Sequence, residues 1–314
     1  MKCLVTGASG FIGAELCRQL QARGDDVVAT SRSGVPLPDG TATIALDLAT
    51  GHIDSALLVG VDTVFHLAGI AHTRAQAAQY ERVNFQATDA LAAAARSAGV
   101  RCFVFLSSVK AMGSAGSAAV RAEADVAMPR DAYGLSKWHA ECALRESGHN
   151  GAMAVVILRP ALVYGAQAKG NLALLAKAAR LGLPRPPAGG ARSMIAQADL
   201  VSLLLLLTGL ELRGVHTWIA TDGEQYTTRR IYDALRSAQG AGPTPAWLPS
   251  WCWHGAAALY DLWRGKQGDS TSLKLFGDER FSNDALITAT GWQPSQTLES
   301  TLQSASLMLR EVDK

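Results

Sequence analysis

Tyr133 and Lys137, in the sequence YGLSK, are the residues of this 314-residue chain whose types and spacing most clearly allow chemistry. A spacing of four residues places both side chains on one face of a helix. We expect the ammonium group to lower the pKa of the phenol, so that the phenol exchanges a proton nearer neutral pH. Ser108 ends an apolar run upstream, and its hydroxyl can share a substrate oxygen with Tyr133. These three residues predict a proton-transfer site at a substrate oxygen.

A glycine-rich turn near the N-terminus predicts a dinucleotide site. The sequence TGASGFIG places Gly7, Gly10 and Gly13 between an apolar strand and a helical stretch. Glycines there allow a tight turn and let backbone N–H groups approach a pyrophosphate at the helix N-terminus. A strand, this turn and a helix, in this order, are typical of a site for a nicotinamide dinucleotide.

The residues that close the second strand indicate which dinucleotide is bound. An acidic residue that holds the ribose diol of NAD is expected about 20 residues after the glycines. The stretch DDVVATSRSG has Ser31 and Arg32 at this place. A guanidinium can grip a 2′-phosphate in bidentate fashion, so we favour NADP(H), with NAD(H) as the alternative. Asp47 is expected to meet the adenine edge, and Ala68 and Gly69 form a floor of small residues under the cofactor.

Short apolar runs alternate with helical stretches through the first half of the chain, which is typical of a parallel sheet covered by helices. We expect strands over 2–7, 26–31, 41–48, 61–69, 101–108, 152–160 and 214–221. We expect helices over 11–24, 131–148, 226–240, 251–263 and 297–310, and one long alanine-rich helix over 75–99. The leucine-rich run from Leu200 is too short to span a bilayer and predicts a buried helix. The fold class is therefore α/β: a doubly wound Rossmann sheet with a smaller, mostly helical C-terminal substrate lobe.

The pattern changes after Pro160, and a loop rich in proline and glycine follows at 183–194. We therefore expect two lobes. The dinucleotide-binding lobe comprises residues 1–163 and takes back about 195–220. The substrate-binding lobe comprises residues 164–194 and 221–314.

The composition excludes several classes of protein. The net charge is +2 and there is no basic run, so we expect no nucleic-acid partner. The five cysteines form no CxxC pair and the seven histidines show no ligand spacing, so neither a disulfide framework nor a metal site is indicated. The N-terminus leads straight into a strand, which leaves no room for a signal peptide. We expect a cytoplasmic protein without a membrane span.

Five motifs occur in an order and spacing that resemble the extended short-chain dehydrogenase/reductases: TGASGFIG, HLAG, FLSSVKAMG, YGLSK and RPALVYG. The resemblance covers essentially the whole chain, since GWQPSQTLESTL is similar to the usual closing segment of this NAD-dependent epimerase/dehydratase group. It implies that Ser108, Tyr133 and Lys137 are catalytic and that Lys137 also holds the nicotinamide ribose. The cofactor residues that it implies are Gly7, Gly10, Gly13, Asp47, Ala68, Gly69 and Asn84. With their neighbours, the candidate cofactor set also includes Ser9, Phe11, Ile12, Ser31, Arg32, Leu48, Leu67 and Pro160.

Within this family the segments KGNLALLAKAARLGLP and GGARSMIAQADLV resemble nucleotide-sugar epimerases and 4-keto-sugar reductases of bacterial surface-polysaccharide pathways, such as lipopolysaccharide synthesis. The resemblance implies that Asn171 and Arg192, with Ser108 and Tyr133, contact a UDP- or dTDP-linked sugar, and a guanidinium suits the diphosphate. It also implies a homodimer formed through two helices of each subunit, one of which carries Tyr133.

Several reactions remain open. A dehydratase of this family needs an Asp-Glu pair where this chain has Val109 and Lys110, so dehydration is disfavoured. A reductase would deliver hydride from NADPH to a 4-keto-6-deoxy sugar and a proton from Tyr133. The exchangeable cofactor that it needs fits Ser31 and Arg32, so we favour this reaction. The alternatives are a 4-epimerase with tightly held NAD, a reductase of an apolar ketone such as a steroid or flavonoid, and an NADP-binding redox sensor without turnover.

The segment WLPSWCWHGAAALYDLWRG gathers five aromatic side chains: Trp247, Trp251, Trp253, Tyr260 and Trp263. Such a cluster can line a sugar pocket, touch a membrane surface, form a partner face or pack inside the small lobe. We expect packing.

Overall fold

Seven parallel strands form the main sheet, in the order β3-β2-β1-β4-β5-β6-β9. They are β1 (Lys2–Thr6), β2 (Asp26–Ser31), β3 (Ile44–Ala45), β4 (Thr63–His66), β5 (Cys102–Leu106), β6 (Ala154–Pro160) and β9 (Val215–Ala220). The structure is a computed structural model, and it describes residues 1–314 except 72–74, 115–118, 149–151, 166–170, 265–269 and 305–314. The strand order reverses between β1 and β4, and open sheets of this kind bind ligands at the carboxyl ends of the strands beside such a reversal.

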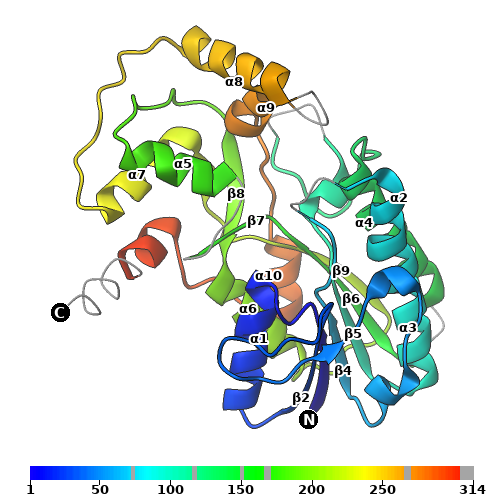
Figure 1. Cartoon of the computed structure of the whole chain (residues 1–314). Helices are drawn as coiled ribbons and strands as arrows, with labels where there is room; N and C mark the ends of the chain where they lie inside the picture. Colours follow the sequence, from blue (N-terminus) through cyan, green and yellow to red (C-terminus); the bar gives the residue numbers. More distant parts are fainter. Residues whose placement is uncertain (72–74, 115–118, 149–151, 166–170, 265–269, 305–314) are drawn as a thin grey trace.

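Helices cover both faces of this sheet (Figure 1). One face carries α1 (Phe11–Ala22), α6 (Gln197–Leu207) and α10 (Asp284–Thr290), and the other carries α2 (Ala77–Tyr80), α3 (Ala87–Ser97) and α4 (Ala132–Gly148). Neighbouring residues of one strand enter different clusters: Val5 packs with the first group of helices and Leu4 with the second. The expected doubly wound α/β fold is confirmed.

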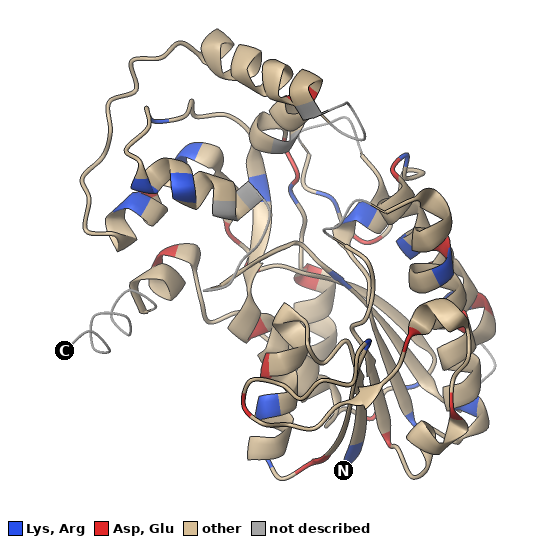
Figure 2. Cartoon of the chain, in the orientation of Figure 1, with Lys and Arg blue, Asp and Glu red and all other residues tan. Residues whose placement is uncertain are grey.

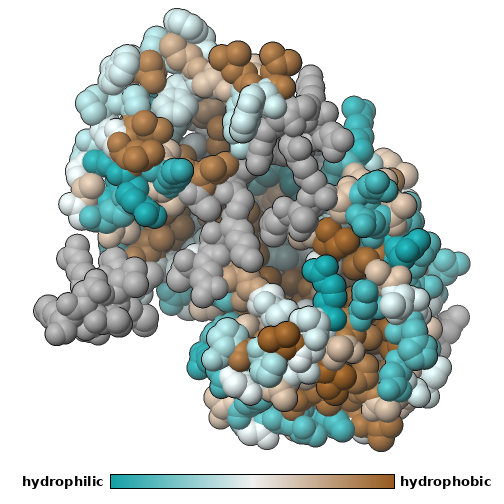
Figure 3. Space-filling view, viewed as in Figure 1, coloured by the Kyte–Doolittle hydropathy of each residue, from teal (hydrophilic) through white to brown (hydrophobic). Residues whose placement is uncertain are grey.

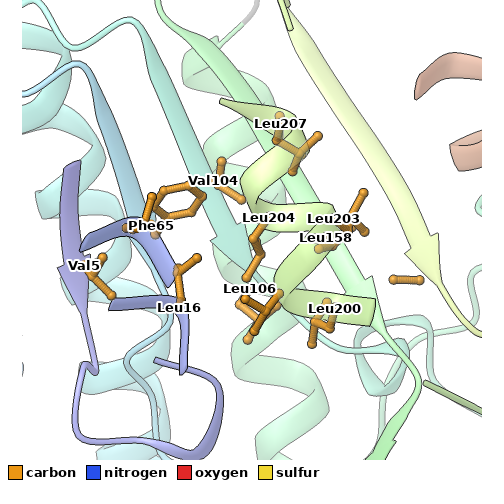
Figure 4. Packing of buried hydrophobic residues seen from close by; sticks show 14 of the residues in the cluster. Val5, Leu16, Phe65, Val104, Leu106, Leu158, Leu200, Leu203, Leu204 and Leu207 are labelled. Atoms are coloured by element: carbon orange, nitrogen blue, oxygen red, sulfur yellow. The ribbon is translucent and has the colours of Figure 1, made fainter. Parts of the chain in front are cut away.

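The larger cluster joins the sheet to α1 and α6. Figure 4 shows Val5, Phe65 and Val104 from three strands meeting leucines of the two helices. In α6, the residues Leu200, Leu203, Leu204 and Leu207 are all buried, which confirms that the leucine-rich run forms a core helix. Among the described residues, no helix is both long and apolar enough to cross a membrane.

A smaller lobe contains a second sheet with the order β10-β8-β7. Its elements are β7 (Leu162–Tyr164), α5 (Asn171–Arg180), β8 (Ala191–Ala196), β10 (Gln225–Thr227), α7 (Thr228–Ala238), α8 (Ser250–Arg264) and α9 (Thr271–Phe276). Thr227 caps α7 by accepting a hydrogen bond from the Arg230 N–H at 3.1 Å, as the sequence suggests. The expected loop over 183–194 is wrong at its end, because residue 191 already begins β8, a buried strand paired with β7 and β10. Lysines, arginines and acidic residues are mixed over both lobes (Figure 2).

Three tryptophans of the aromatic segment that leads into and forms α8 lie on the surface. Trp247, Trp251 and Trp263 are 69%, 73% and 82% exposed. Figure 3 shows hydrophobic atoms along the upper rim of the molecule, where Figure 1 places α8. The expectation that the aromatic segment packs inside the small lobe is wrong for these three residues, because α8 contacts chiefly α9 and does so with its other side.

Three further details of the expected elements differ. The single helix expected over 75–99 is α2, a π-helical turn η3 (Glu81–Gln86) and then α3. The strand expected over 41–48 shrinks to the two residues of β3, and 3-10 turns follow as η1 (Leu48–Thr50) and η2 (Ser55–Leu58). A third 3-10 turn, η4 (Val109–Met112), follows β5. In the last expected helix, residues 298–304 are helical and 305–310 lie outside the described residues.

Candidate active site

The turn between β1 and α1 and the first turn of α1 each need a glycine. Gly7 has a φ of +71°, and a Cβ on it would lie 2.8 Å from the backbone of Ala68. A Cβ on Gly13 would lie 2.3 Å from the Gly7 carbonyl oxygen. Gly10 is the N-cap of α1, and no side chain caps this helix end. The first N–H groups of a helix have no intrahelical partner, so this cradle fits an anionic pyrophosphate.

Six further candidates for cofactor contact lie around this edge of the sheet: Ser9, Phe11, Ile12, Leu48, Leu67 and Pro160. Ser9 is exposed in the turn, whereas Leu48 and Pro160 are buried. Ile12 and Leu67 pack against the larger core cluster. The Phe11 carbonyl accepts a hydrogen bond from Gln197, which ties the turn to the start of α6.

Asn84 lies at the centre of the π-helical turn and is fully buried. Its Oδ1 accepts from the Ile70 N–H at 2.8 Å, and its Nδ2 donates to the Ile70 carbonyl at 3.0 Å and to Ser136 Oγ at 3.1 Å. Inserted π-turns are frequent at functional sites because they redirect one side chain. Here the redirected amide joins the loop after β4, with Ala68 and Gly69, to α4. All of these hydrogen bonds are made to other protein groups, so Asn84 fixes the position of the loop after β4, which forms the floor of the cofactor site.

A chain of buried hydrogen bonds fixes the protonation of His66 at the end of β4. Thr88 Oγ1 donates to the Asn84 carbonyl at 2.7 Å, so this hydroxyl must accept from His66 Nε2, 2.9 Å away. The proton is therefore on Nε2, and Nδ1 accepts from Thr6 Oγ1 at 2.7 Å. Thr6 Oγ1 in turn accepts from the Ala68 N–H at 3.3 Å. Burial, with a smaller contribution from the charge of Lys137, lowers the pKa of His66 to about 3 and keeps the ring neutral.

The candidate cofactor residues that follow β2 and β3 differ in burial and in their hydrogen bonds. Ser31 is buried, and its Oγ lies 2.9 Å from Thr43 Oγ1 and accepts from the Gly34 N–H at 3.0 Å. Arg32 is exposed and makes no hydrogen bond or ion pair with the described part of the chain. Asp47 caps the η1 turn by accepting from the Ala49 N–H at 3.0 Å. Ser31 therefore shapes the turn and leaves the Arg32 guanidinium available to an anion.

Ser108 and Tyr133 meet where β5 ends and α4 begins. Ser108 is the N-cap of η4 and accepts from the Lys110 N–H at 3.2 Å. A hydrogen bond joins Ser108 to the phenol of Tyr133, and the ring of Tyr80 packs edge-on against the Tyr133 ring at 6.1 Å. Burial raises the pKa of Tyr133 to about 12, although the Ser108 hydrogen bond lowers it. The phenol is therefore protonated at neutral pH.

Lys137 stands one helical turn after Tyr133 and is 4% exposed. Its Nζ donates to the Leu106 carbonyl at 2.8 Å and lies 4.5 Å from the centre of the Phe105 ring. Burial lowers the pKa of Lys137 to about 8, against the opposing effect of Glu141. The expectation that Lys137 lowers the pKa of Tyr133 is wrong for this arrangement, because burial outweighs the other influences on the phenol. Burial removes water from both groups and so favours the neutral phenol of Tyr133 and the neutral amine of Lys137.

Glu141, one further turn along α4, is the centre of a buried polar cluster that the sequence did not predict. Its carboxylate accepts from Ser107 Oγ at 2.6 Å, from Arg159 Nη2 at 2.6 Å and from Arg145 Nη2 at 2.8 Å. Glu141 and Arg159 are 0% and 1% exposed. The cluster connects β5, β6 and α4 directly behind Ser108 and Lys137. The signal in the sequence was weak: an arginine inside an otherwise apolar strand.

The small lobe reaches this site through residues 278–281. Lys110 and Glu279 form an ion pair across the two lobes, and together with Arg280 they line a small pocket beside Val109. Arg192 is 8% exposed and donates to the Leu275 carbonyl at 3.1 Å, but its Nε has no hydrogen-bond partner among the described residues. Asn171 begins α5, and its side chain lies outside what the structure describes. The contribution of the segment after α9 was missed because only the fold brings it against β8.

The glycine cradle, the paired Ser108 and Tyr133 and the buried Lys137 stand at the carboxyl ends of neighbouring parallel strands, and they define a nicotinamide-dependent oxidoreductase of the Rossmann type. The chain belongs to the NAD dependent epimerase/dehydratase family, whose model matches residues 3–209.

Relatives of the chain include enzymes with different reactions. It is 29% identical to the UDP-glucose 4-epimerase of Vibrio cholerae, with 98% of this chain and 95% of that protein covered. It is 30% identical to the 2-alkyl-3-oxoalkanoate reductase of Stenotrophomonas maltophilia, with 77% and 76% covered. Among solved structures, MoeE5 in complex with UDP-glucose and NAD superposes over 100% of both chains with a TM-score of 0.79 and 25% identity. The family, the fold and an enzymatic role are thus established, and the expected resemblance is confirmed.

Proposed function

We propose that this enzyme uses NADPH to reduce the 4-keto group of a nucleotide-linked 6-deoxy sugar to an alcohol, in the synthesis of a surface-polysaccharide precursor. The observation that carries the proposal is the end of β2, where an exposed, unpaired Arg32 stands in place of a ribose-binding acid. A guanidinium there favours the 2′-phosphate of NADPH. A reductase needs such an exchangeable, reduced cofactor in every turnover.

Tyr133 is the proton donor that this reaction needs. When bound, NADPH supplies the hydride that reduces the ketone carbon. Tyr133, with its pKa raised to about 12, holds the proton that the new alkoxide takes up. Ser108 shares its hydroxyl with Tyr133 and orients the ketone oxygen.

The protonated form of Lys137 assists this transfer from behind the phenol. Its Nζ is held by the Leu106 carbonyl and lies beside Gly69, where we propose that its other donors bind the nicotinamide ribose. Its pKa of about 8 keeps the ammonium charged at neutral pH, where it favours the transfer of a proton to the alkoxide. Val109 and Lys110, which follow Ser108, provide no carboxylate for a dehydration step at those positions.

Arg192 is the anchor that we propose for the diphosphate of the substrate. Its guanidinium is buried and has an Nε without a partner, and a buried donor of this kind is costly unless something accepts from it. A diphosphate oxygen would satisfy it. Asn171 at the start of α5 is proposed as a second contact. UDP is the favoured nucleotide because MoeE5 binds UDP-glucose, and dTDP is the alternative.

A second candidate is a 4-epimerase acting on a UDP-sugar with tightly held NAD. It is favoured by the match to the Vibrio cholerae epimerase over nearly the whole chain and by the NAD complex of MoeE5. A reductase of an apolar ketone is a third candidate, which the match to the Stenotrophomonas maltophilia reductase supports. The homodimer that the family resemblance implies stays a prediction.

The test compares two cofactors and two substrates on one preparation. Nucleotide that co-purifies with the protein is identified first, and NADPH and NADH are then titrated by fluorescence. We expect a preference for NADPH and its consumption when a UDP-linked 4-keto-6-deoxy sugar is added. Non-exchanging NAD, with inversion at C4 of UDP-glucose followed by NMR, would replace this proposal with the epimerase. Turnover of an apolar ketone with no binding of UDP would replace it with the third candidate.

A further inference from the structure

The end of β5 is held by three polar side chains of α4. The strand stops at Leu106, so Ser107 and Ser108 lie beyond its last residue. Three successive residues there each contact one side chain of α4, in the pairs Leu106–Lys137, Ser107–Glu141 and Ser108–Tyr133. The three α4 residues are spaced by four and therefore lie on one face of the helix. Ser107 and Glu141 form the only one of these pairs that has no residue of the proposed proton transfer.

The contact between Ser107 and Glu141 is buried and charge-assisted. Ser107 is 4% exposed and Glu141 is 0% exposed. The Ser107 hydroxyl donates to the carboxylate at 2.6 Å, a length typical of a strong hydrogen bond to an ionised acceptor. The Ser107 N–H donates to the Leu158 carbonyl at 2.8 Å. The backbone of Ser107 is thus tied to β6 and its side chain to α4, immediately before Ser108.

Arg159 of β6 fixes the orientation of the carboxylate. Its Nε donates to Glu141 Oε1 at 2.9 Å, and its Nη2 donates to Oε2 at 2.6 Å. Two parallel hydrogen bonds of this kind define the plane of the carboxylate as well as its position. Arg145 adds a third donor at 2.8 Å. The carboxylate therefore cannot turn away from Ser107 without leaving a buried guanidinium unsatisfied.

The charge of Glu141 also acts on Lys137. Burial lowers the pKa of Lys137 to about 8, and Glu141 opposes this effect. The other titratable groups around the ammonium are the Tyr133 phenol on α4 and the His66 ring on β4, which are both neutral at pH 7, and the cation of Arg159 lies beyond the carboxylate. Removal of the carboxylate would leave Lys137 among neutral groups and cations, which disfavour the ammonium.

From these contacts we infer that Glu141 is a positioning residue of the active site, which sets Ser108 against Tyr133 through Ser107 and holds Lys137 in its ammonium form by charge. The inference rests on the proton-transfer role proposed for Ser108, Tyr133 and Lys137. All three candidate reactions share this transfer, so the inference does not depend on which substrate the enzyme takes. Tyr133→Phe, measured alongside, tests the role on which it rests.

The first test removes the Ser107 hydroxyl. Ser107→Ala is compared with Ser147→Ala, which removes a hydroxyl that accepts from Arg96 at 3.0 Å near the far end of α4. Both are assayed on whichever candidate substrate the wild type turns over. We expect kcat of Ser107→Ala to fall about tenfold or more, because a small misplacement of a reacting group is costly. Its solvent deuterium isotope effect should rise, because proton transfer becomes the slow step, and Ser147→Ala should match the wild type in both. A smaller folded fraction alone would lower kcat and leave the isotope effect unchanged.

The second test needs no substrate. The ¹⁵N NMR signals of the lysine ammonium groups are followed against pH, and the Lys137 signal is identified by its loss in Lys137→Arg. We expect Lys137 to titrate near pH 8 in the wild type and in Glu146→Gln, which changes an exposed residue of the same helix. In Glu141→Gln the midpoint should move to lower pH by about 1.

Either of two results would overturn the inference: Ser107→Ala with the kcat and isotope effect of Ser147→Ala, or a Lys137 midpoint that is the same in both glutamine variants. The serine variants decide if Glu141→Gln does not fold, and the lysine titration decides if none of the candidate substrates is turned over. An active Tyr133→Phe enzyme would instead contradict the proposed proton transfer itself, so the two failures are distinguishable.

Discussion

Two regions of the molecule invert the usual distribution of polar and apolar side chains. Behind the candidate active site, Lys137, Glu141 and Arg159 are 4%, 0% and 1% exposed, although charged residues are almost never buried unless they are paired. On α8, Trp251 and Leu262 are 73% and 80% exposed. Scattered exposed leucines are ordinary, but buried charges and contiguous exposed apolar groups are informative.

The two inversions are resolved in different ways. No side-chain nitrogen or oxygen of Lys137, Glu141 or Arg159 lacks a hydrogen-bond partner in the described structure, so the polar atoms of this buried region are satisfied within the chain. The exposed tryptophans and leucines of α8 contact no other buried cluster among the described residues. The comparison teaches that buried polar groups can be tested by removing one partner, because the partner left behind is then unsatisfied.

The largest effect is expected from Tyr133→Phe. Loss of the proton donor should lower kcat for ketone reduction by about 10²–10⁴-fold and leave the affinity for NADPH unchanged. Tyr260→Phe, on α8, is the control and should leave kcat as it is. Stopped-flow measurement of NADPH oxidation checks both variants. If the Tyr133→Phe enzyme stayed active, Tyr133 would not be the proton donor, and the buried polar region behind it would serve stability alone.

Glu141→Gln is expected to lower the free energy of unfolding by about 3 kcal/mol, because it leaves the buried Arg159 guanidinium without its counter-charge. Glu146→Gln changes an exposed residue of the same helix and should cost little. Urea unfolding of both variants measures the difference. Equal small losses would mean that the buried ion pair is not a source of stability behind the active site.

Arg32→Ala is expected to raise the Kd for NADPH about tenfold or more, since a hydrogen bond between charged groups contributes about 1.5–3 kcal/mol. The Kd for NADH should not change, because NADH lacks the 2′-phosphate. Arg101→Ala, at an exposed position just before β5 and therefore at the amino ends of the strands, serves as the control in the same fluorescence titration. A parallel loss for both cofactors would argue against a 2′-phosphate site.

A fourth prediction concerns pH and stability. The pKa of His66 is lowered from 6.5 to about 3, so below 6.5 the unfolded chain takes up a proton that the folded ring refuses. The free energy of unfolding should therefore fall by about 1.4 kcal/mol per pH unit as the pH drops from 6.5 toward 3. Asp222 opposes this trend, because burial raises its pKa from 3.8 to about 6 and the folded state binds its proton first.

His66→Gln isolates the histidine contribution from that of Asp222. The stability advantage of the wild type over this variant should shrink by about 2 kcal/mol between about pH 7 and about pH 5. Urea unfolding at the two pH values measures it. Parallel stability curves would mean that His66 titrates normally and that the hydrogen-bond chain through Thr6 and Thr88 does not hold it neutral.

The fold could be predicted from the sequence where local pattern and burial coincide. The apolar runs of β1, β4 and β5 are buried on both faces, so each is a continuous apolar stretch. The turn at Gly7 and Gly13 could be predicted because its backbone geometry admits no side chain. The spacing of Tyr133 and Lys137 predicts one helix face, and α4 carries both.

The tertiary structure alone decided the properties that depend on distant segments. Glu141 and Arg159 stand on different elements, and neither residue reveals the other in the sequence. The pKa of Tyr133 rises because burial is set by everything packed around it, whereas the sequence shows only the neighbouring lysine. The π-helical turn that directs Asn84 between two elements breaks an alanine-rich stretch of uniform helix propensity. The exposure of α8 depends on which of its sides meets α9, and the sequence of the helix does not show that its polar His254 and Asp261 face the protein while Trp251 and Trp263 stay uncovered.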